Sequence, residues 1–197
     1  MGFILRIVVG ILAGVAVATL ASCEPRGQAV GDTQHAAQDV AHDADPGAPL
    51  TVAVIGAIAG ARADSLVTGA LKAGALEPYY VPCADLKDEA AGAEAAADGI
   101  RDAVRRHVKL IMVLDLLMDD DTEPTWTAAL KDARDGGIPV VLVDPVDDPP
   151  DALLFAATFT IDERAKDATP IATAAKDVIV DAPHARDITV STLTGGE

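Results

Sequence analysis

Apolar and polar positions alternate with two different periods from about residue 50 onward, and residues 126–145 show the pattern best. Apolar side chains recur there at helical spacing, at Trp126, Ala129, Leu130 and Ala133. This spacing predicts a helix with one buried face. Gly136 and Gly137 follow, and glycine ends helices because it adopts left-handed backbone without steric strain. Residues 138–143 are then continuously apolar, which is typical of a strand covered on both faces.

The same alternation of helical and strand patterns continues along the chain. Strands are predicted at residues 50–55, 77–82, 108–114, 138–143, 153–161 and 188–193. Helices are predicted at residues 64–74, 85–107, 126–135 and 163–181. In the last helix, Pro170 forces a kink or a late restart. The order predicts an α/β fold, a doubly wound and mostly parallel sheet of Rossmann-like type with right-handed crossovers.

Three of the predicted strands end in an acidic residue: Asp115, Asp144 and Asp162. The carboxyl ends of parallel strands lie at one edge of a sheet, and open α/β sheets bind their ligands at that edge. A carboxylate there accepts hydrogen bonds from the hydroxyl groups of a ligand. These three residues are therefore the candidate ligand contacts. The alternative is that each is a surface acid at the end of a strand.

Composition and charge narrow the classes of partner. The 197 residues carry 31 acidic and 15 basic side chains, a net charge of -16. Binding to nucleic acid is not expected, because it requires clustered Lys and Arg. A run of acids at residues 119–123 offers oxygen ligands to a hard cation, but it lacks EF-hand spacing, and a solvated charge run at a helix start is preferred. The glycine-containing loop at residues 56–60 lacks the spacing of a nucleotide-binding loop.

The first 22 residues have the pattern of a signal peptide. Arg6 is the single positive charge before an apolar run at residues 7–20, which is short for a membrane span. Leu20-Ala21-Ser22-Cys23 follows and resembles the bacterial lipobox. The resemblance implies cleavage before Cys23, lipidation of Cys23, and a lipid-anchored, extracytoplasmic protein. The alternative is an uncleaved N-terminal anchor in which Cys23 is incidental.

Residues 23–49 predict a flexible tether, because they are rich in Gly, Ala, Asp, Gln and Pro and show no apolar period. His35 and His42 lie among acids in this stretch, which would allow metal binding, but the composition favours a solvated spacer. If Cys23 is lipidated, Cys83 has no cysteine partner in the chain, and we expect it to be a small buried residue at a strand end.

From residue 50 onward, the chain resembles the N-terminal lobe of the type I periplasmic sugar-binding proteins, the ribose- and galactose-binding group. The best-matching stretch is Ala128-Ala129-Leu130-Lys131-Asp132-Ala133 through Gly137-Ile138-Pro139-Val140-Val141-Leu142-Val143-Asp144. Gly69-Ala70 and Asp162 also fall in register with the family. The resemblance implies a single α/β lobe at residues 50–162, a small sugar as ligand, and an ABC permease as partner.

The departures from the family pattern are equally informative. The loop at residues 57–63 has no aromatic residue to stack on a sugar, and Pro145 stands where the family often has a sugar-binding Arg. Residues 163–197 would supply only the crossover helix and first strand of a second lobe. The resemblance therefore implies a truncated or degenerate solute-binding lipoprotein of an ABC import system, whose missing lobe would be a separate partner.

The sequence is also compatible with a second class of function and argues against a third. One is a membrane-anchored interaction or dimerising module without a small-molecule ligand, which would use an exposed apolar face at residues 163–180. The other is an enzyme, which is not expected because the chain has no Ser-His-Asp context and no zinc-spaced pair of histidines. No cofactor and no metal site are predicted.

Overall fold

A computed structural model describes residues 27–34, 49–58, 62–83 and 88–193. Seven parallel strands form one sheet in the order β2-β1-β3-β4-β5-β7-β6. The strands are β1 (Thr51–Ile55), β2 (Glu77–Val81), β3 (Leu110–Leu114), β4 (Val140–Val143), β5 (Ala157–Ile161), β6 (Thr169–Pro170) and β7 (Asp187–Ser191). The helices are α1 (Arg62–Ala73), α2 (Glu89–Arg105), α3 (Glu123–Asp135) and α4 (Ile171–Ile179). The predicted α/β fold with a parallel sheet is confirmed.

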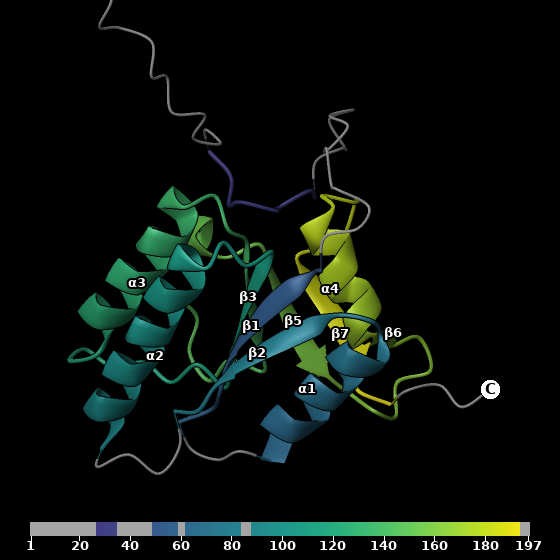
Figure 1. Ribbon diagram of the computed structural model, residues 1–197, viewed down its shortest axis with the longest axis horizontal. Coiled ribbons are helices and arrows are strands. Elements are labelled where there is room, and N and C mark those ends of the chain that lie inside the picture. Colours follow the sequence, from purple (N-terminus) through teal and green to yellow (C-terminus); the bar gives the residue numbers. More distant parts are fainter. Residues whose placement is uncertain (1–26, 35–48, 59–61, 84–87, 194–197) are drawn as a thin grey trace, which may run out of the picture.

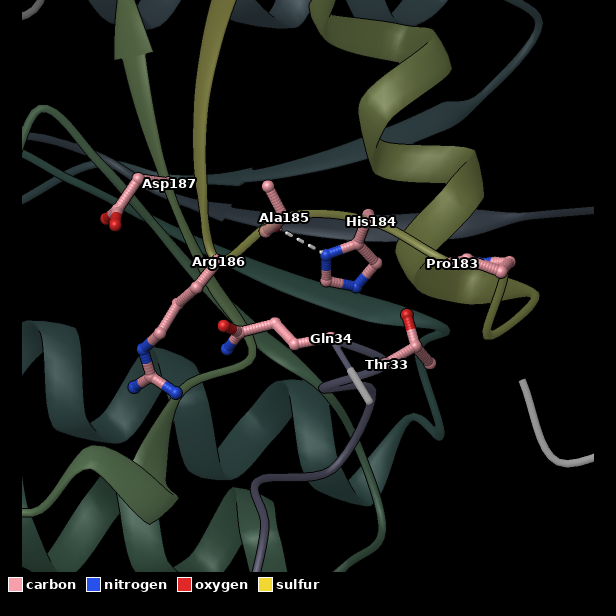
Figure 2. Close-up of a pocket in the computed structure, with 7 residues that line it drawn as sticks. All are labelled: Thr33, Gln34, Pro183, His184, Ala185, Arg186 and Asp187. Carbon is pink, nitrogen blue, oxygen red and sulfur yellow. Dashed lines mark hydrogen bonds between the residues drawn. The ribbon is translucent and has the colours of Figure 1, made fainter. Parts of the chain in front are cut away.

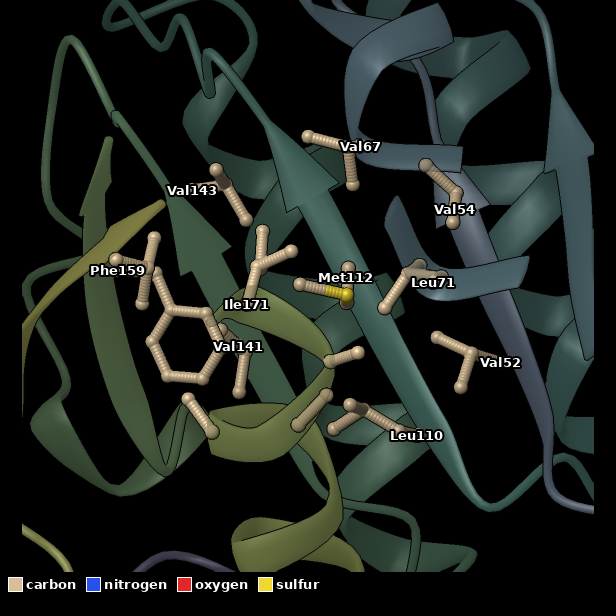
Figure 3. Packing of buried hydrophobic residues seen from close by; sticks show 14 of the residues in the cluster. Val52, Val54, Val67, Leu71, Leu110, Met112, Val141, Val143, Phe159 and Ile171 are labelled. Atoms are coloured by element: carbon tan, nitrogen blue, oxygen red, sulfur yellow. The ribbon is translucent and has the colours of Figure 1, made fainter. Parts of the chain in front are cut away.

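Helices cover both faces of the sheet, α2 and α3 on one face and α1 and α4 on the other (Figure 1). Successive strand residues alternate between the two apolar cores: Val52 and Val54 belong to the core beneath α1 and α4 (Figure 3), and Ala53 and Ile55 to the core beneath α2 and α3. This double burial explains why the strands read as continuous apolar runs rather than as alternating ones.

The stretch from α3 to β4 folds as its pattern predicts. Trp126 is 1% exposed, and its indole N–H donates to the Leu117 carbonyl at 3.0 Å. Gly137 has a φ of +68°, the left-handed conformation that ends the helix. All four residues of β4 are buried.

Three elements differ from the prediction in the second half of the chain, and one of them is the short strand β6, which lies where a helix was expected. The strand expected at residues 153–161 begins only at Ala157, because a 3-10 turn, η1 (Ala152–Leu154), precedes it. The Asp151 carboxylate accepts the Leu153 N–H at 2.9 Å and so caps this turn. The helix expected at residues 163–181 is only α4, which begins directly after Pro170. Of the two predicted alternatives, a kink or a late restart, the structure therefore has the late restart. Proline has no N–H to donate to a preceding turn, so the helix begins after it.

α4 and β7 extend the same sheet and core as residues 51–161. β7 pairs in parallel with β5, and Ile171, Ala175 and Val178 of α4 are buried against α1 and the sheet. The resemblance had placed these segments in a second lobe. The prediction of an exposed apolar face at residues 163–180 is wrong, because the face that the helical pattern shows is covered by α1 and the sheet.

Residues 27–34, within the predicted tether, cross the amino edge of the sheet (Figure 1), and Ala29 is 1% exposed. Cys23, His35 and His42 lie outside the described residues. Among the helices that the structure describes, none has the length and apolar content needed to cross a membrane.

Candidate functional site

The carboxyl edge of the sheet carries the predicted acidic residues. The chain runs from β1 to β2 on one side and then to β3 on the other, so the switch point of the sheet lies between β1 and β3. Four residues that follow strands here extend the ladder through their backbone N–H groups. The bonds, each 2.9 Å, are Gly56 to Val81, Asp115 to Val143, Asp144 to Phe159, and Asp162 to Val190. These bonds join β1 to β2, and they link β3, β4, β5 and β7 in turn at this edge.

Asp115 and Asp144 have unusual backbone conformations at the ends of the neighbouring strands β3 and β4. Their φ angles are +46° and +45°, in the left-handed region. A non-glycine residue in that region carries roughly 1–2 kcal/mol of strain, although Asp tolerates it better than most residues. Strained residues of this kind cluster at functional sites.

The carboxyl groups of these two residues are partly buried, which disfavours their charged form. Burial raises the pKa of Asp115, and the negative charges of Asp144 and Asp64 raise it further. Burial also raises the pKa of Asp144, while the Ile161 N–H, 3.0 Å from Asp144 Oδ1, opposes this effect. Within the described ranges, the Asp115 carboxyl has no hydrogen-bond partner, so its oxygens are open to a ligand.

Asp162 differs from the other two predicted residues. It is exposed, and its carboxylate accepts the Arg164 N–H at 2.9 Å within the turn that follows β5. The structure thus brings Asp115 and Asp144 together and leaves Asp162 further along the edge.

A third carboxylate at this edge, Asp64, was not identified from the sequence. It is 2% exposed, and it accepts the Tyr80 hydroxyl at 2.6 Å and the Ala57 N–H at 3.3 Å. A Cβ on Gly56 would lie 2.6 Å from Asp64 Oδ2 and 2.7 Å from the Tyr80 hydroxyl, so this close approach requires glycine. Burial, followed by the Asp64 hydrogen bond, raises the pKa of Tyr80. The only sequence signal for Asp64 was an acid in the first turn of a helix, which is common at helix starts.

Cys83 lies just after β2 and is fully buried, as predicted. Burial, with a smaller contribution from the Asp64 charge, raises the pKa of its thiol to about 11. The thiol is therefore protonated at neutral pH and is a weak nucleophile.

The acidic run before α3 has a local structural role. Asp119 Oδ1 accepts the Thr122 N–H at 2.8 Å, the Thr122 hydroxyl at 2.8 Å and the Asp121 N–H at 3.1 Å. These bonds lower the pKa of Asp119, and the bonds from Thr122 contribute most. In the part of the chain that the structure describes, no group of three or more His, Cys, Asp and Glu side chains is arranged to hold a metal ion.

One cavity lies at the amino edge of the sheet and another adjoins the carboxyl edge. An open groove of about 600 Å³ is at the amino edge, away from the aspartates, and is lined by residues 33–34 and 183–187 (Figure 2). A cavity of about 360 Å³ lies beside α1 and β2 and is lined by Asp64, Ser65, Thr68, Lys72, Pro78 and Tyr80. This second cavity adjoins the carboxyl edge through Asp64 and Tyr80.

No protein-family model matches the sequence, and no curated protein matches it. Three solved structures resemble the fold at low identity. A galactofuranose-binding protein is 20% identical with a TM-score of 0.42, and the match covers 72% of this chain and 56% of that one. A protein of Mycobacterium smegmatis in complex with β-D-fucofuranose is 18% identical with a TM-score of 0.42, over 73% of this chain and 54% of that one.

The third structure is the periplasmic binding component of an arabinose ABC transporter from Shewanella sp. ANA-3, bound to α- and β-L-arabinofuranose. It is 18% identical with a TM-score of 0.39, and the match covers 72% of this chain and 55% of that one. The chain therefore spans little more than half the length of each of the three.

Proposed function

We propose that the chain is a solute-binding-type lipoprotein of an import system and that the carboxyl edge of its sheet contacts a small polyhydroxylated solute such as a sugar. The observation that carries the proposal is the pair Asp115 and Asp144. Both have left-handed backbone on neighbouring strands, and both have a partly buried carboxyl group with a raised pKa. Strained backbone and desolvated acids at a switch point favour a ligand site over two incidental surface acids.

The chemistry of the edge suits hydroxyl groups. A carboxylate accepts hydrogen bonds only, and each of its oxygens accepts more than one. The Asp115 oxygens and the remaining capacity of Asp144 would accept from neighbouring hydroxyls of one solute, with Asp162 a further contact along the edge. A single lobe leaves one side of such a solute in water, so we propose that a second lobe or a permease supplies the other side.

The proposed anchor is a lipid on Cys23, which would place the protein outside the cytoplasm on the bacterial cell membrane. Its support is the sequence alone: a single early positive charge, a short apolar run, and small residues directly before the cysteine.

The decisive measurement is calorimetric titration of the full chain with pentoses, hexoses and their derivatives, including the furanose sugars named for the three solved structures. We expect Asp115→Asn and Asp144→Asn each to weaken binding about tenfold or more, because each removes a charged acceptor worth about 1.5–3 kcal/mol. Asp148→Asn, an exposed acid in the turn after β4, is the matched control and should bind as the parent does. No heat with any sugar would refute the proposal.

The alternative is an interaction module that docks another protein on this edge. Four of the large apolar side chains that are exposed lie there, at Leu66, Tyr80, Val146 and Leu193. Light scattering tests this alternative in its dimeric form. A dimer that Val146→Asp and Leu193→Asp convert to a monomer would support it, and a strict monomer without partners would count against it.

A further inference from the structure

Residues 27–34, which we call the strap, lie against the amino edge of the sheet (Figure 1). The aspartates lie at the opposite, carboxyl edge. The middle of the strap packs closely against the amino edge. Ala29 is 1% exposed, and Gly31 has a φ of +79°. A Cβ on Gly31 would lie 2.8 Å from the Cβ of Pro139, so both the backbone and the available space require glycine there.

An ion pair joins the strap to Arg186, the residue just before β7. Arg186 lies 3.2 Å from the Asp32 carboxylate, and the two side chains are only 22% and 13% exposed. Arg186 also donates to the Ala152 carbonyl at 2.7 Å and lies over the Phe155 ring at 4.2 Å. Its guanidinium is therefore positioned by the domain itself and offers the strap a partner with little further ordering.

Hydrogen bonds hold both ends of the strap. At one end, Arg134 of α3 donates to the Gln28 carbonyl at 2.9 Å. At the other end, the Thr33 hydroxyl donates to the Ala182 carbonyl at 2.6 Å. Between them, His184 Nε2 lies 2.9 Å from the Gly31 carbonyl. The strap is thus held by hydrogen bonds to a side chain of α3 and to side-chain and backbone groups of the α4–β7 turn.

We infer that the strap is an orienting device that sets which edge of the domain faces the membrane. The inference rests on the proposed lipid anchor for its membrane part. A free tether from Cys23 to residue 50 would let the domain turn in any direction. With the strap docked, only four residue steps separate Cys23 from Gly27, a reach of about 14 Å. The amino edge then lies toward the bilayer.

The consequence for the proposed site is that the carboxyl edge points away from the lipid. Asp115, Asp144 and Asp162 are kept apart from anionic headgroups, which would repel them. The partner that the proposed function needs, a second lobe or a permease surface, would approach from the outer side.

The docking of the strap is tested in the full chain by hydrogen exchange of the peptide that covers residues 28–33. The Asp32 N–H, which donates to the Ala29 carbonyl at 3.2 Å, is the amide to follow. We expect Asp32→Asn to speed its exchange about tenfold, the effect of losing one charge-assisted bond. Arg186→Gln should do the same from the domain side, and Arg164→Gln, at the opposite edge, is the matched control.

The amides of β3 report whether either variant loosens the whole domain, since they should keep their protection if only the strap is released. Exchange of the strap at the rate of an unfolded peptide in the parent protein would overturn the inference. So would a strap that neither variant affects.

The orientation is tested with the lipidated full chain in phosphatidylcholine–phosphatidylglycerol vesicles. A fluorescent label on Lys109→Cys marks the amino edge and a label on Asp148→Cys marks the other edge; Cys83 is buried and should resist labelling. We expect a headgroup quencher to quench the first label several-fold more than the second, and Asp32→Asn to reduce the difference. Equal quenching overturns the orientation. A chain that does not float with the vesicles overturns the anchor and the orientation with it, while the exchange result decides the docking separately.

Discussion

At the scale of single residues, Asp115 and Asp144 occupy energetically unfavourable positions in the described part of the fold. Each combines left-handed backbone with a partly buried acid, and neither has an ion-pair partner among the described residues. Asp64 adds a third carboxylate close by, although its bonds to Tyr80 and Ala57 partly compensate for its burial. Such a cluster lowers stability and is expected where position matters more than stability.

The pH dependence of stability follows from the raised pKa values of Asp115 and Asp144. A folded-state pKa above the unfolded value means that the stability these groups contribute is present below about pH 3.9, the ordinary Asp value, and is lost as the pH rises through the folded pKa. We therefore expect Asp115→Asn and Asp144→Asn to be more stable than the parent at pH 7 and similar to it at pH 3.5. Asn also keeps the tolerance for left-handed backbone. Urea unfolding at the two pH values measures this.

Asp119→Asn is the control with the opposite sign. The pKa of Asp119 is lowered, so its contribution is present above the ordinary Asp pKa and is lost as the pH falls through the lowered one. This variant should be less stable than the parent at pH 7. A loss of stability at pH 7 in both the Asp115 and Asp144 variants would contradict our account of the edge.

At the scale of elements, the contact between α1 and α4 explains why the end of the chain belongs to this core. Gly74, just after α1, lies so near α4 that a Cβ there would overlap the Ala172 side chain. The buried face of α4, with Ile171 and Val178 below 1% exposed, then rests on the sheet and α1. The close approach of the two helices depends on small residues at their crossing.

We expect Gly74→Ala to lower the free energy of unfolding by about 1–3 kcal/mol, because it forces α4 away from α1. Gly69→Ala is the matched control within α1, since a Cβ there meets nothing within 4 Å. It should raise stability by up to about 1 kcal/mol through helix propensity. Chemical denaturation followed by circular dichroism measures both, and equal effects would mean that the two helices do not pack as described.

At the scale of the whole molecule, one sheet with two cores predicts one cooperative unit. Val178 of α4 is fully buried in one core, while Trp126, the single tryptophan of the chain, is buried in the other. We expect Val178→Ala to lower the free energy of unfolding by about 2 kcal/mol, as for other buried truncations. Tryptophan fluorescence, which reports from the opposite face, should show the full shift.

Val180→Ala, at a side chain that is 45% exposed, should change stability by less than about 0.5 kcal/mol. If Trp126 reported an unchanged transition in Val178→Ala, residues 163–193 would form a separate unit, as the resemblance to a two-lobed family had suggested.

The sequence by itself determined six of the seven strands, the largely parallel sheet, and the acids Asp115, Asp144 and Asp162 at strand ends. It did so because the period of apolar residues reports which faces are buried, and residues 126–145 show both periods with a glycine stop between them. It also predicted the burial of Cys83, but it missed the two-residue strand β6.

Only the tertiary structure decided what covers each buried face. The helical pattern around Ile171 showed an apolar face, but only the fold showed that α1 and the sheet bury it. Asp64 and Tyr80 are 16 residues apart, and nothing local predicts their bond. Polar residues 27–34 read as a solvated tether because their partners, such as Arg186, lie about 150 residues later. Local periodicity carries no information on such long-range contacts. Those contacts hold the strap at the amino edge, and they position Asp64 at the carboxyl edge that we propose to bind a solute.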